Sequence, residues 1–303
     1  MLISFDETRK NKFRSIILMF FFIIIIGVLG AFIGLLYDNV YIGLIIAVII
    51  SLVYSIIALN AGRNMILTLS RARPVTKKEF PYLYHSIEAV AISAGLPAPK
   101  AYVIDDPALN AFATGKDPKN AAITVTTGLL NKLNRQELEG VIAHEMAHIK
   151  NYDIRFMMLT AVMVGIIVLL SDFLLRTFLW SSISGRGRSY GRAGGKATII
   201  FIIVGLVLAI LTPLIGELIK LAISRKREYM ADATGASLTR YPPGLANALR
   251  KISGDANPML ASANKATAHL YISSPFCKKK NFLNNLFSTH PPIEDRIKRL
   301  DAM

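Results

Sequence analysis

The residues with the clearest capacity for chemistry are His144 and His148, which stand four positions apart with Glu145 between them. On an α-helix, residues four apart lie on one face, so both imidazole rings can reach a single metal ion. Zinc binds neutral imidazole, and a catalytic zinc site has three protein ligands and one position left for water. Glu145 lies beside the pair, where it can accept a proton from that water. The pattern therefore predicts a zinc hydrolase.

A third ligand must come from another part of the chain, and the best candidates are Glu228 and Asp232, which are also four residues apart. One carboxylate can bind the metal while the other accepts the N–H of a ligating histidine and fixes its tautomer. Taken alone, an acidic pair on a helix is usually a solvated surface. The histidine motif makes this pair a candidate, and the spacing leaves open which carboxylate is the ligand.

Several stretches resemble the HtpX family of membrane-bound zinc metallopeptidases, which are related to the CAAX prenyl proteases. The matching pieces are HEMAH at 144–148, REYMAD at 227–232, NAFATG at 110–115, ITVTTGLL from Ile123 and THPPIEDRI from Thr289. The similarity covers nearly the whole chain. The resemblance implies that His144, His148 and Glu228 bind one Zn²⁺ per subunit. It also implies that Glu145 is the general base and that Asp232 supports a ligating histidine.

The resemblance also points to Asn110, His290 and Arg296, whose counterparts in the related proteases lie around the bound peptide and the metal. His290 is followed by two rigid prolines and is predicted to donate a hydrogen bond to the oxyanion of the transition state. Arg296 is predicted to pair with a carboxylate near the metal or with substrate. Without the family, His290 would merely begin the last helix and Arg296 would be a surface charge. Residues 110–115 are predicted to form an edge strand to which an extended substrate adds.

Two long apolar stretches near the N-terminus predict a membrane anchor. Residues 15–37 and 41–59 contain no charged side chain, and a helix needs about 20 apolar residues to cross the hydrocarbon core. The short polar turn between them predicts a helical hairpin rather than a cleaved signal peptide. Residues 156–180 and 197–223 form a second apolar pair. Charges within that pair leave open whether it spans the bilayer.

The remaining segments have the composition of a globular protein. Helices are predicted over 81–95, 134–150, 225–238, 243–253 and 293–300, and strands over 101–104, 111–114 and 121–126. Four parts follow: an N-terminal transmembrane hairpin at 1–60, a first part of the protease domain with the HEMAH helix at 61–155, an apolar hairpin at 156–223, and a second part with the third zinc ligand at 224–303. The predicted fold is mainly α with a small β-sheet, as a membrane-anchored zincin-like (gluzincin) protease domain plus transmembrane helices.

Composition and charge support a membrane protein. Of the 303 residues, 53% are hydrophobic and 18% are charged, whereas soluble domains carry about a quarter charged residues. A net charge of +15 suits nucleic acid, anionic lipid or topology-setting loops, and the apolar runs favour the last two. The Gly- and Arg-rich segment 185–196 is interpreted as a flexible connector, so no nucleic-acid partner is expected. One cysteine, Cys277, excludes a disulfide framework and a cysteine-based zinc finger.

The predicted function is a zinc metalloendopeptidase of a bacterial or archaeal plasma membrane, with its catalytic domain in the cytoplasm, because basic residues concentrate on that side. Its partners would be the lipid bilayer and polypeptide substrates, among them membrane or misfolded proteins. The resemblance implies a role in protein quality control. The alternatives are a prenyl-protein protease and a non-catalytic metal-binding membrane adaptor. Asp153 is predicted to tether the end of the histidine helix, His85 to lie on a helix surface or pack, and His269 has no assigned role.

Overall fold

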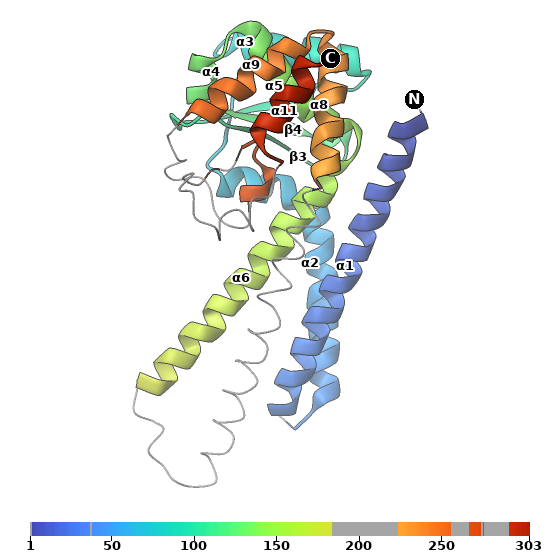
Figure 1. The fold of residues 1–303 in the computed structure, drawn as a ribbon. Coiled ribbons are helices and arrows are strands. Elements are labelled where there is room, and N and C mark those ends of the chain that lie inside the picture. The colour runs from blue at the N-terminus through green and yellow to red at the C-terminus, as the bar shows by residue number, and fades with distance from the viewer. Residues whose placement is uncertain (1, 37, 184–223, 256–266, 274, 276–290) are drawn as a thin grey trace.

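Three long helices extend from one end of a domain that is built on a small sheet (Figure 1). The computed structural model describes residues 2–36, 38–183, 224–255, 267–273, 275 and 291–303. The long helices are α1 (Leu2–Leu36), α2 (Val40–Leu69) and α6 (Asp153–Ile183). The N-terminal end of α1 lies beside the domain, and the turn between α1 and α2 lies at the far end of the hairpin (Figure 1).

Helices α1 and α2 form the hairpin that the apolar runs predict. Both are long and apolar enough to cross a membrane, over Glu7–Leu35 and Val40–Leu69. The side chain of Asn39 begins α2 by accepting a hydrogen bond of 3.1 Å from the backbone N–H of Ile42. Large apolar side chains such as Phe20 remain exposed along the two helices. An exposed apolar surface of this kind is stable in lipid and unfavourable in water.

The sheet has four strands in the order β1-β2-β4-β3. They are β1 (Arg73–Pro74), β2 (Lys100–Ile104), β3 (Ala111–Thr114) and β4 (Ala122–Thr126). β2 and β4 run parallel, whereas β1 and β3 pair antiparallel with their neighbours. The three predicted strands are confirmed, and β1 was missed because two residues give no periodicity. β3 lies at one end of this order, so the sheet presents an edge there.

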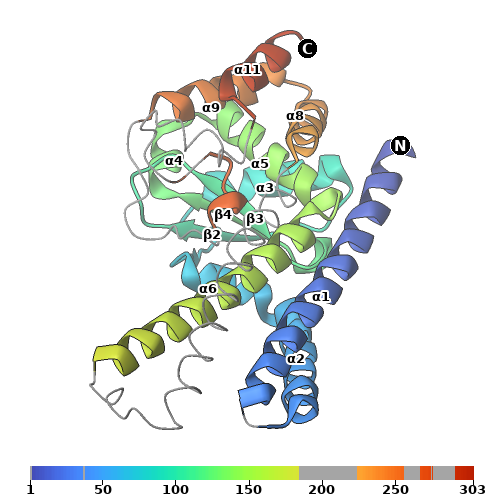
Figure 2. The ribbon, with the colours of Figure 1, turned by 60° about the horizontal axis from the view of Figure 1, so that its bottom comes forward.

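The predicted helices of the domain are also confirmed. They are α3 (Pro81–Ala94), α5 (Arg135–Lys150), α8 (Arg225–Thr239), α9 (Pro242–Gly254) and α11 (Ile293–Asp301). A short helix, α4 (Thr127–Lys132), was not predicted. Helix α5 contacts α3, α8, α9 and β3, and α5, α8, α9 and α11 gather on one side of the sheet (Figure 2). The fold class is therefore the predicted one, mainly helical with a small sheet.

A sharp bend separates the histidine helix from the third long helix. α5 and α6 meet at 83°, and Tyr152 at the break has a left-handed φ of 60°. α6 then contacts α1 and α2 and contains the predicted apolar segment 156–180. Its predicted partner, 197–223, and the basic connector 185–196 lie outside the described residues. That this second hairpin crosses the membrane therefore stays a prediction.

The crossing of α5 and α9 tests this packing. A Cβ on Gly140 would lie 2.6 Å from the backbone nitrogen of Leu245 and 2.8 Å from its Cα. Gly140→Ala should therefore lower the free energy of unfolding by about 1–3 kcal/mol, as overpacking does. Thermal unfolding in detergent measures the effect. Gly254→Ala is the matched control, because among the described residues no atom outside its own helix and chain neighbours lies within 4 Å of its added Cβ. Equal stability of the two variants would contradict the close crossing.

Candidate metal centre

Helix α5 presents its two histidines because its start and its packing are both fixed locally. The side chain of Asn134 accepts a bond of 3.0 Å from the N–H of Glu137, whose carboxylate accepts one of 2.8 Å from the N–H of Asn134. This is the reciprocal capping box that begins a helix. His144 and His148 lie on later turns of the same helix, and both are buried. Their Nε2 atoms lie 3.2 Å apart.

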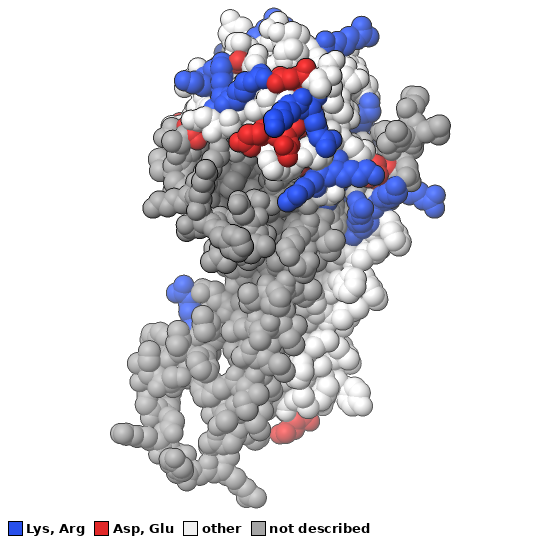
Figure 3. Space-filling model, viewed as in Figure 1, with Lys and Arg blue, Asp and Glu red and all other residues white. Residues whose placement is uncertain are grey.

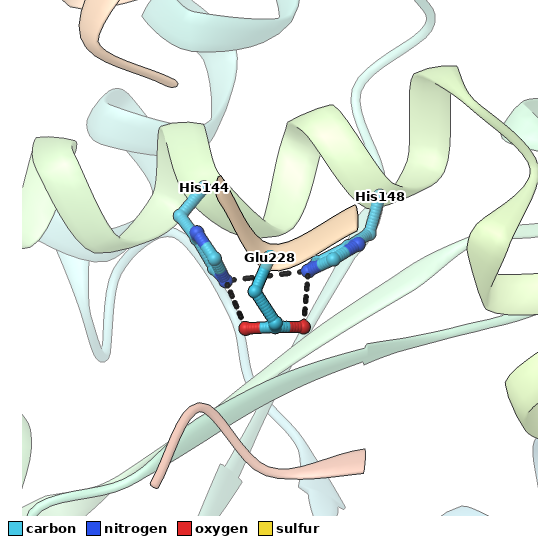
Figure 4. A group of neighbouring side chains, drawn as sticks. All are labelled: His144, His148 and Glu228. Atoms are coloured by element: carbon cyan, nitrogen blue, oxygen red, sulfur yellow. Dashed lines mark hydrogen bonds and ion pairs between the residues drawn. The ribbon is translucent and has the colours of Figure 1, made fainter. Parts of the chain in front are cut away.

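Glu228 of α8 faces both rings. Its Oε2 lies 3.8 Å from Nε2 of His144, and its Oε1 lies 3.6 Å from Nε2 of His148. Figure 4 shows the carboxylate lying across from the two imidazoles, with both oxygens turned toward them. One ligand atom from each of the three residues lies within 4.8 Å of the others. The structure therefore brings together three side chains that are 84 positions apart at their extremes, from His144 to Glu228.

Each imidazole is held through its other nitrogen by a carboxylate. Nδ1 of His144 lies 2.9 Å from Oδ1 of Asp232, and Nδ1 of His148 lies 3.0 Å from Oδ2 of Asp153. Because a carboxylate only accepts, Nδ1 carries the proton and Nε2 keeps its lone pair for a metal. Two imidazole nitrogens and one carboxylate oxygen are a donor set that zinc uses in catalytic sites. The residues therefore fit a divalent metal ion.

Asp153 has more contacts than the sequence suggested. The sequence predicts that it tethers the end of the histidine helix, and the structure places it as the first residue of α6. It also contacts the ring of His148, because the bend between α5 and α6 turns its carboxylate back toward α5. Asp153 is five residues after His148, and this spacing does not place two side chains on one face of a helix. The sequence therefore does not predict the contact. The left-handed residue Tyr152 lies at the bend that turns Asp153 back toward α5.

Arg296 of α11 is fully buried, at 0% exposure, so the interpretation as a surface charge is excluded. Its Nε and one terminal nitrogen donate to the two oxygens of Asp232 at 2.8 and 2.7 Å. Its other terminal nitrogen lies 3.6 Å from Oε2 of Glu228. Burial by itself raises the pKa of Asp232, but the positive charge of Arg296 and the hydrogen bonds with Arg296 and His144 together outweigh burial and lower that pKa below its usual range. Asp232 is therefore held as a carboxylate.

Glu145 lies on the same helix and is also buried. Burial raises the pKa of Glu145, although the neighbouring imidazoles and a hydrogen bond with the backbone of Ala113 act in the opposite direction. A carboxylate with a raised pKa is a better proton acceptor than an ordinary glutamate. The contact with Ala113 also places Glu145 against the edge strand β3. Its role as general base stays a prediction that this environment favours.

The remaining predicted site residues are Asn110 and His290. Asn110 donates to the carbonyl of Ser273 at 3.0 Å and accepts from its N–H at 3.4 Å, so it pairs with a neighbouring segment of the chain. The N–H of Ile272 likewise donates to the carbonyl of Ala111 at 2.9 Å. A contact of Asn110 with substrate stays a prediction. His290 lies outside the described residues.

The remaining described histidines stand apart from the three candidate ligands. His269 is buried, and its Nε2 lies 3.1 Å from the carbonyl of Met157. His85 is on the surface of α3, with its Nδ1 3.6 Å from a carboxylate oxygen of Glu88. Within the described residues, the group on α5 and α8 is the one set of His, Cys, Asp and Glu side chains that could hold a metal ion.

Comparisons with known proteins relate this chain to a family of peptidases. Residues 77–303 match the family described as Peptidase family M48. A Protease HtpX homolog from Dictyoglomus thermophilum is 47% identical over 299 residues, which cover 99% of this chain and 94% of that protein. One from Listeria monocytogenes is 44% identical over 304 residues and covers 99% of both chains. The crystal structure of S. mikatae Ste24p aligns with a TM-score of 0.49 and 22% identity, over 84% of this chain and 57% of that one.

The protonation of His148 predicts how the metal-free protein responds to pH. Burial alone lowers the pKa of His148, but the hydrogen bond with Asp153 and the charges of Glu228, Asp153 and Glu145 together outweigh burial and raise the pKa from 6.5 to about 9. A proton bound more tightly in the folded state stabilises the fold fully below pH 6.5, and this stabilisation is lost as the pH rises through about 9. In the presence of a chelator, the melting temperature should therefore fall between pH 6.5 and pH 9.

The metal-loaded protein is the control for this pH series. A bound cation replaces the proton on His148, so its melting temperature should fall less over the same interval. Asp153→Asn removes the carboxylate that raises the pKa, so it should reduce the pH dependence of the metal-free protein. A metal-free melting temperature that rises across the interval would contradict the proposed charge state.

Removing the buried guanidinium tests the role of Arg296. Arg296→Met leaves Asp232 buried without its cation, and loss of one partner of a buried ion pair costs about 3–5 kcal/mol of stability. Arg250→Gln breaks an exposed pair with Asp301 and should cost at most about 1 kcal/mol. Thermal unfolding of both metal-free variants compares the two values. Similar losses would show that Arg296 is not paired in a buried site.

Proposed function

The chain belongs to peptidase family M48, among the HtpX homologues, and is a membrane metallopeptidase, and we propose that it is a zinc-dependent endopeptidase with its active site on α5 and α8. The observation that carries this proposal is the convergence of His144, His148 and Glu228, whose candidate ligand atoms lie within 4.8 Å of one another. These residues would hold the metal. Zinc is proposed over other divalent ions because two imidazoles and one carboxylate suit it better than they suit magnesium or calcium.

The protein's own groups would perform the proton transfers. When bound, zinc would supply Lewis acidity, polarising the scissile carbonyl and acidifying the attacking water. Glu145 would accept the proton of that water and then deliver it to the leaving amine. Its buried position, which raises its pKa, supports this role. We propose that His290 donates to the oxyanion, as the resemblance implies.

The substrate would be an extended polypeptide that lies along β3. β3 is an edge strand, and its Ala113 contacts Glu145, so a peptide paired there would pass beside the proposed base. Recognition through backbone hydrogen bonds tolerates many sequences, which suits misfolded or membrane proteins as substrates. Residues 272 and 273 already pair with the Ala111 end of this strand. The Ala113 end is therefore the proposed start of substrate pairing.

We propose a multi-pass arrangement in which the catalytic domain lies in the cytoplasm. Lys and Arg side chains gather over the domain and at its junction with the long helices, whereas the visible described surface farther along the helices is nearly free of them (Figure 3). The N-terminal end of α1 lies on the domain side (Figure 1). Basic residues next to membrane spans are retained on the cytoplasmic side. A role in membrane-protein quality control is the cellular function that this placement and the HtpX homologues support.

The full-length protein in detergent, stripped of metal and reloaded with zinc, tests the proposed function. Glu145→Gln should lower the rate of casein cleavage by roughly 10²–10⁴-fold, because it removes the proton acceptor. It should still bind one zinc ion, measured by elemental analysis. Glu139→Gln is the matched control on the same helix, since Glu139 pairs with Arg135 near the surface and is not among the candidate site residues. It should cleave at the wild-type rate.

Three results would decide against parts of this proposal. Undiminished cleavage by the Glu145 variant would remove Glu145 from the mechanism. Zinc-loaded wild-type protein that never cleaves casein or itself would favour the metal-binding adaptor. A farnesylated peptide cut faster than casein would favour the prenyl-protein protease.

A further inference from the structure

The first membrane helix reaches the metal centre through Asn11. This residue lies near the N-terminal end of the candidate span Glu7–Leu35 and is fully buried, at 0% exposure. Its Nδ2 donates to Oδ1 of Asp153 at 2.6 Å and to the carbonyl of Asn151 at 3.0 Å. The two acceptors flank the bend between α5 and α6. Asn11 therefore fixes the position of α6 at the residue that supports His148.

The carboxylate of Asp153 is shared between the membrane helix and a candidate ligand. One oxygen accepts from Asn11, and the other contacts Nδ1 of His148 at 3.0 Å. Arg227 of α8 lies 3.7 Å from the same oxygen that Asn11 contacts. The carboxylate can therefore turn about its axis only by losing a hydrogen bond to α1, to α5 or both.

The amide of Asn11 is itself oriented. Arg14, one turn later on α1, donates to Oδ1 of Asn11 at 3.3 Å, so the amide nitrogen is the atom that faces Asp153. Lys12 lies over the ring of Tyr152, 4.3 Å from its centroid, so the same turn of α1 contacts the bend a second time. These contacts join one turn of a membrane helix to the segment that carries His148 and Asp153.

The contacts of Asn11 differ from a hydrogen bond that only joins two helices. Tyr54 of α2 donates from its hydroxyl to the carbonyl of Val162 on α6 at 3.1 Å. That bond also joins a membrane helix to α6, but its acceptor touches no candidate ligand. Asn11 instead bonds to the group that orients a ligand. Changes to groups that support metal ligands typically cost 10–100-fold in metal affinity.

We propose that Asn11 is a positioning residue of the metal centre, acting through Asp153 on His148, so that metal affinity depends on how α1 is seated against α6. This inference rests on the proposed function for its ligand assignment. It predicts that the membrane hairpin does more than anchor the domain. Displacement of α1 would release the Asp153 carboxylate and let the His148 ring turn away from the metal.

Zinc affinity of the full-length protein in detergent, measured by competition with a chromophoric chelator, tests the proposal. Asn11→Leu, which keeps the size of the side chain but removes the amide, should weaken zinc binding roughly tenfold, and Asp153→Asn should weaken it roughly 10–100-fold. Because Asn11 acts through Asp153, the double variant should bind no more weakly than Asp153→Asn alone. Tyr54→Phe, which loses a bond between a membrane helix and α6 elsewhere, should stay within about twofold of wild type.

Visible absorption of the cobalt-substituted protein supplies a second measurement. It should change in the Asn11 and Asp153 variants, because the ligand field reports the orientation of the His148 ring, and stay unchanged in Tyr54→Phe. Wild-type affinity in Asn11→Leu, or losses that add in the double variant, would overturn the proposal while leaving the proposed function intact. Wild-type protein that binds zinc without cleaving casein would overturn the proposed function alone. Wild-type protein that binds no zinc would overturn both.

Discussion

The candidate metal centre depends on one constraint, which is the balance of charge among its buried side chains. Among the described residues, four buried carboxylates and two buried guanidiniums surround the histidine pair: Glu145, Asp153, Glu228 and Asp232, with Arg227 and Arg296. With neutral imidazoles this set carries two excess negative charges, which is the charge that one divalent cation neutralises. Uncompensated charge is costly in a buried site. Without the cation, a proton on His148 takes over part of its role, and the surrounding carboxylates raise the pKa of His148 accordingly.

The same constraint explains why so many elements converge on α5. Helix α8 supplies a candidate ligand and the support for His144, α6 supplies the support for His148, and α11 supplies the buried cation. Helix α1 joins them through Asn11. Each polar group has its partner on a different element, so separating any of these helices exposes or orphans a charge. Metal binding and the stability of the domain are therefore linked.

The sequence was sufficient to predict those parts of the site whose sequence pattern is local. The histidine helix follows from a capping box and a spacing of four, and the pair Glu228 and Asp232 follows from the same spacing. It was insufficient where contacts join distant segments. Asn11 and Asp153 are 142 positions apart, and no periodicity relates them. The support that Asp153 gives to His148 depends on the left-handed residue Tyr152, which ordinary propensities do not predict. Arg296 was predictable only through the family resemblance, since the residue alone reads as a surface charge.

The distance from Glu228 to the rings is set by small residues that follow it on α8. Ala231 and Gly235 lie three and seven positions after Glu228, on the same face of the helix, and both are buried. A Cβ on Gly235 would lie 3.0 Å from the backbone nitrogen of His144, so α8 approaches α5 closely at the first histidine. A carboxylate side chain is short, and it can reach a metal between two imidazoles only if the helix axes are this near. Ala231 and Gly235 thus allow the close packing that the candidate metal centre requires, and a larger side chain at either position would move Glu228 away from the two imidazoles.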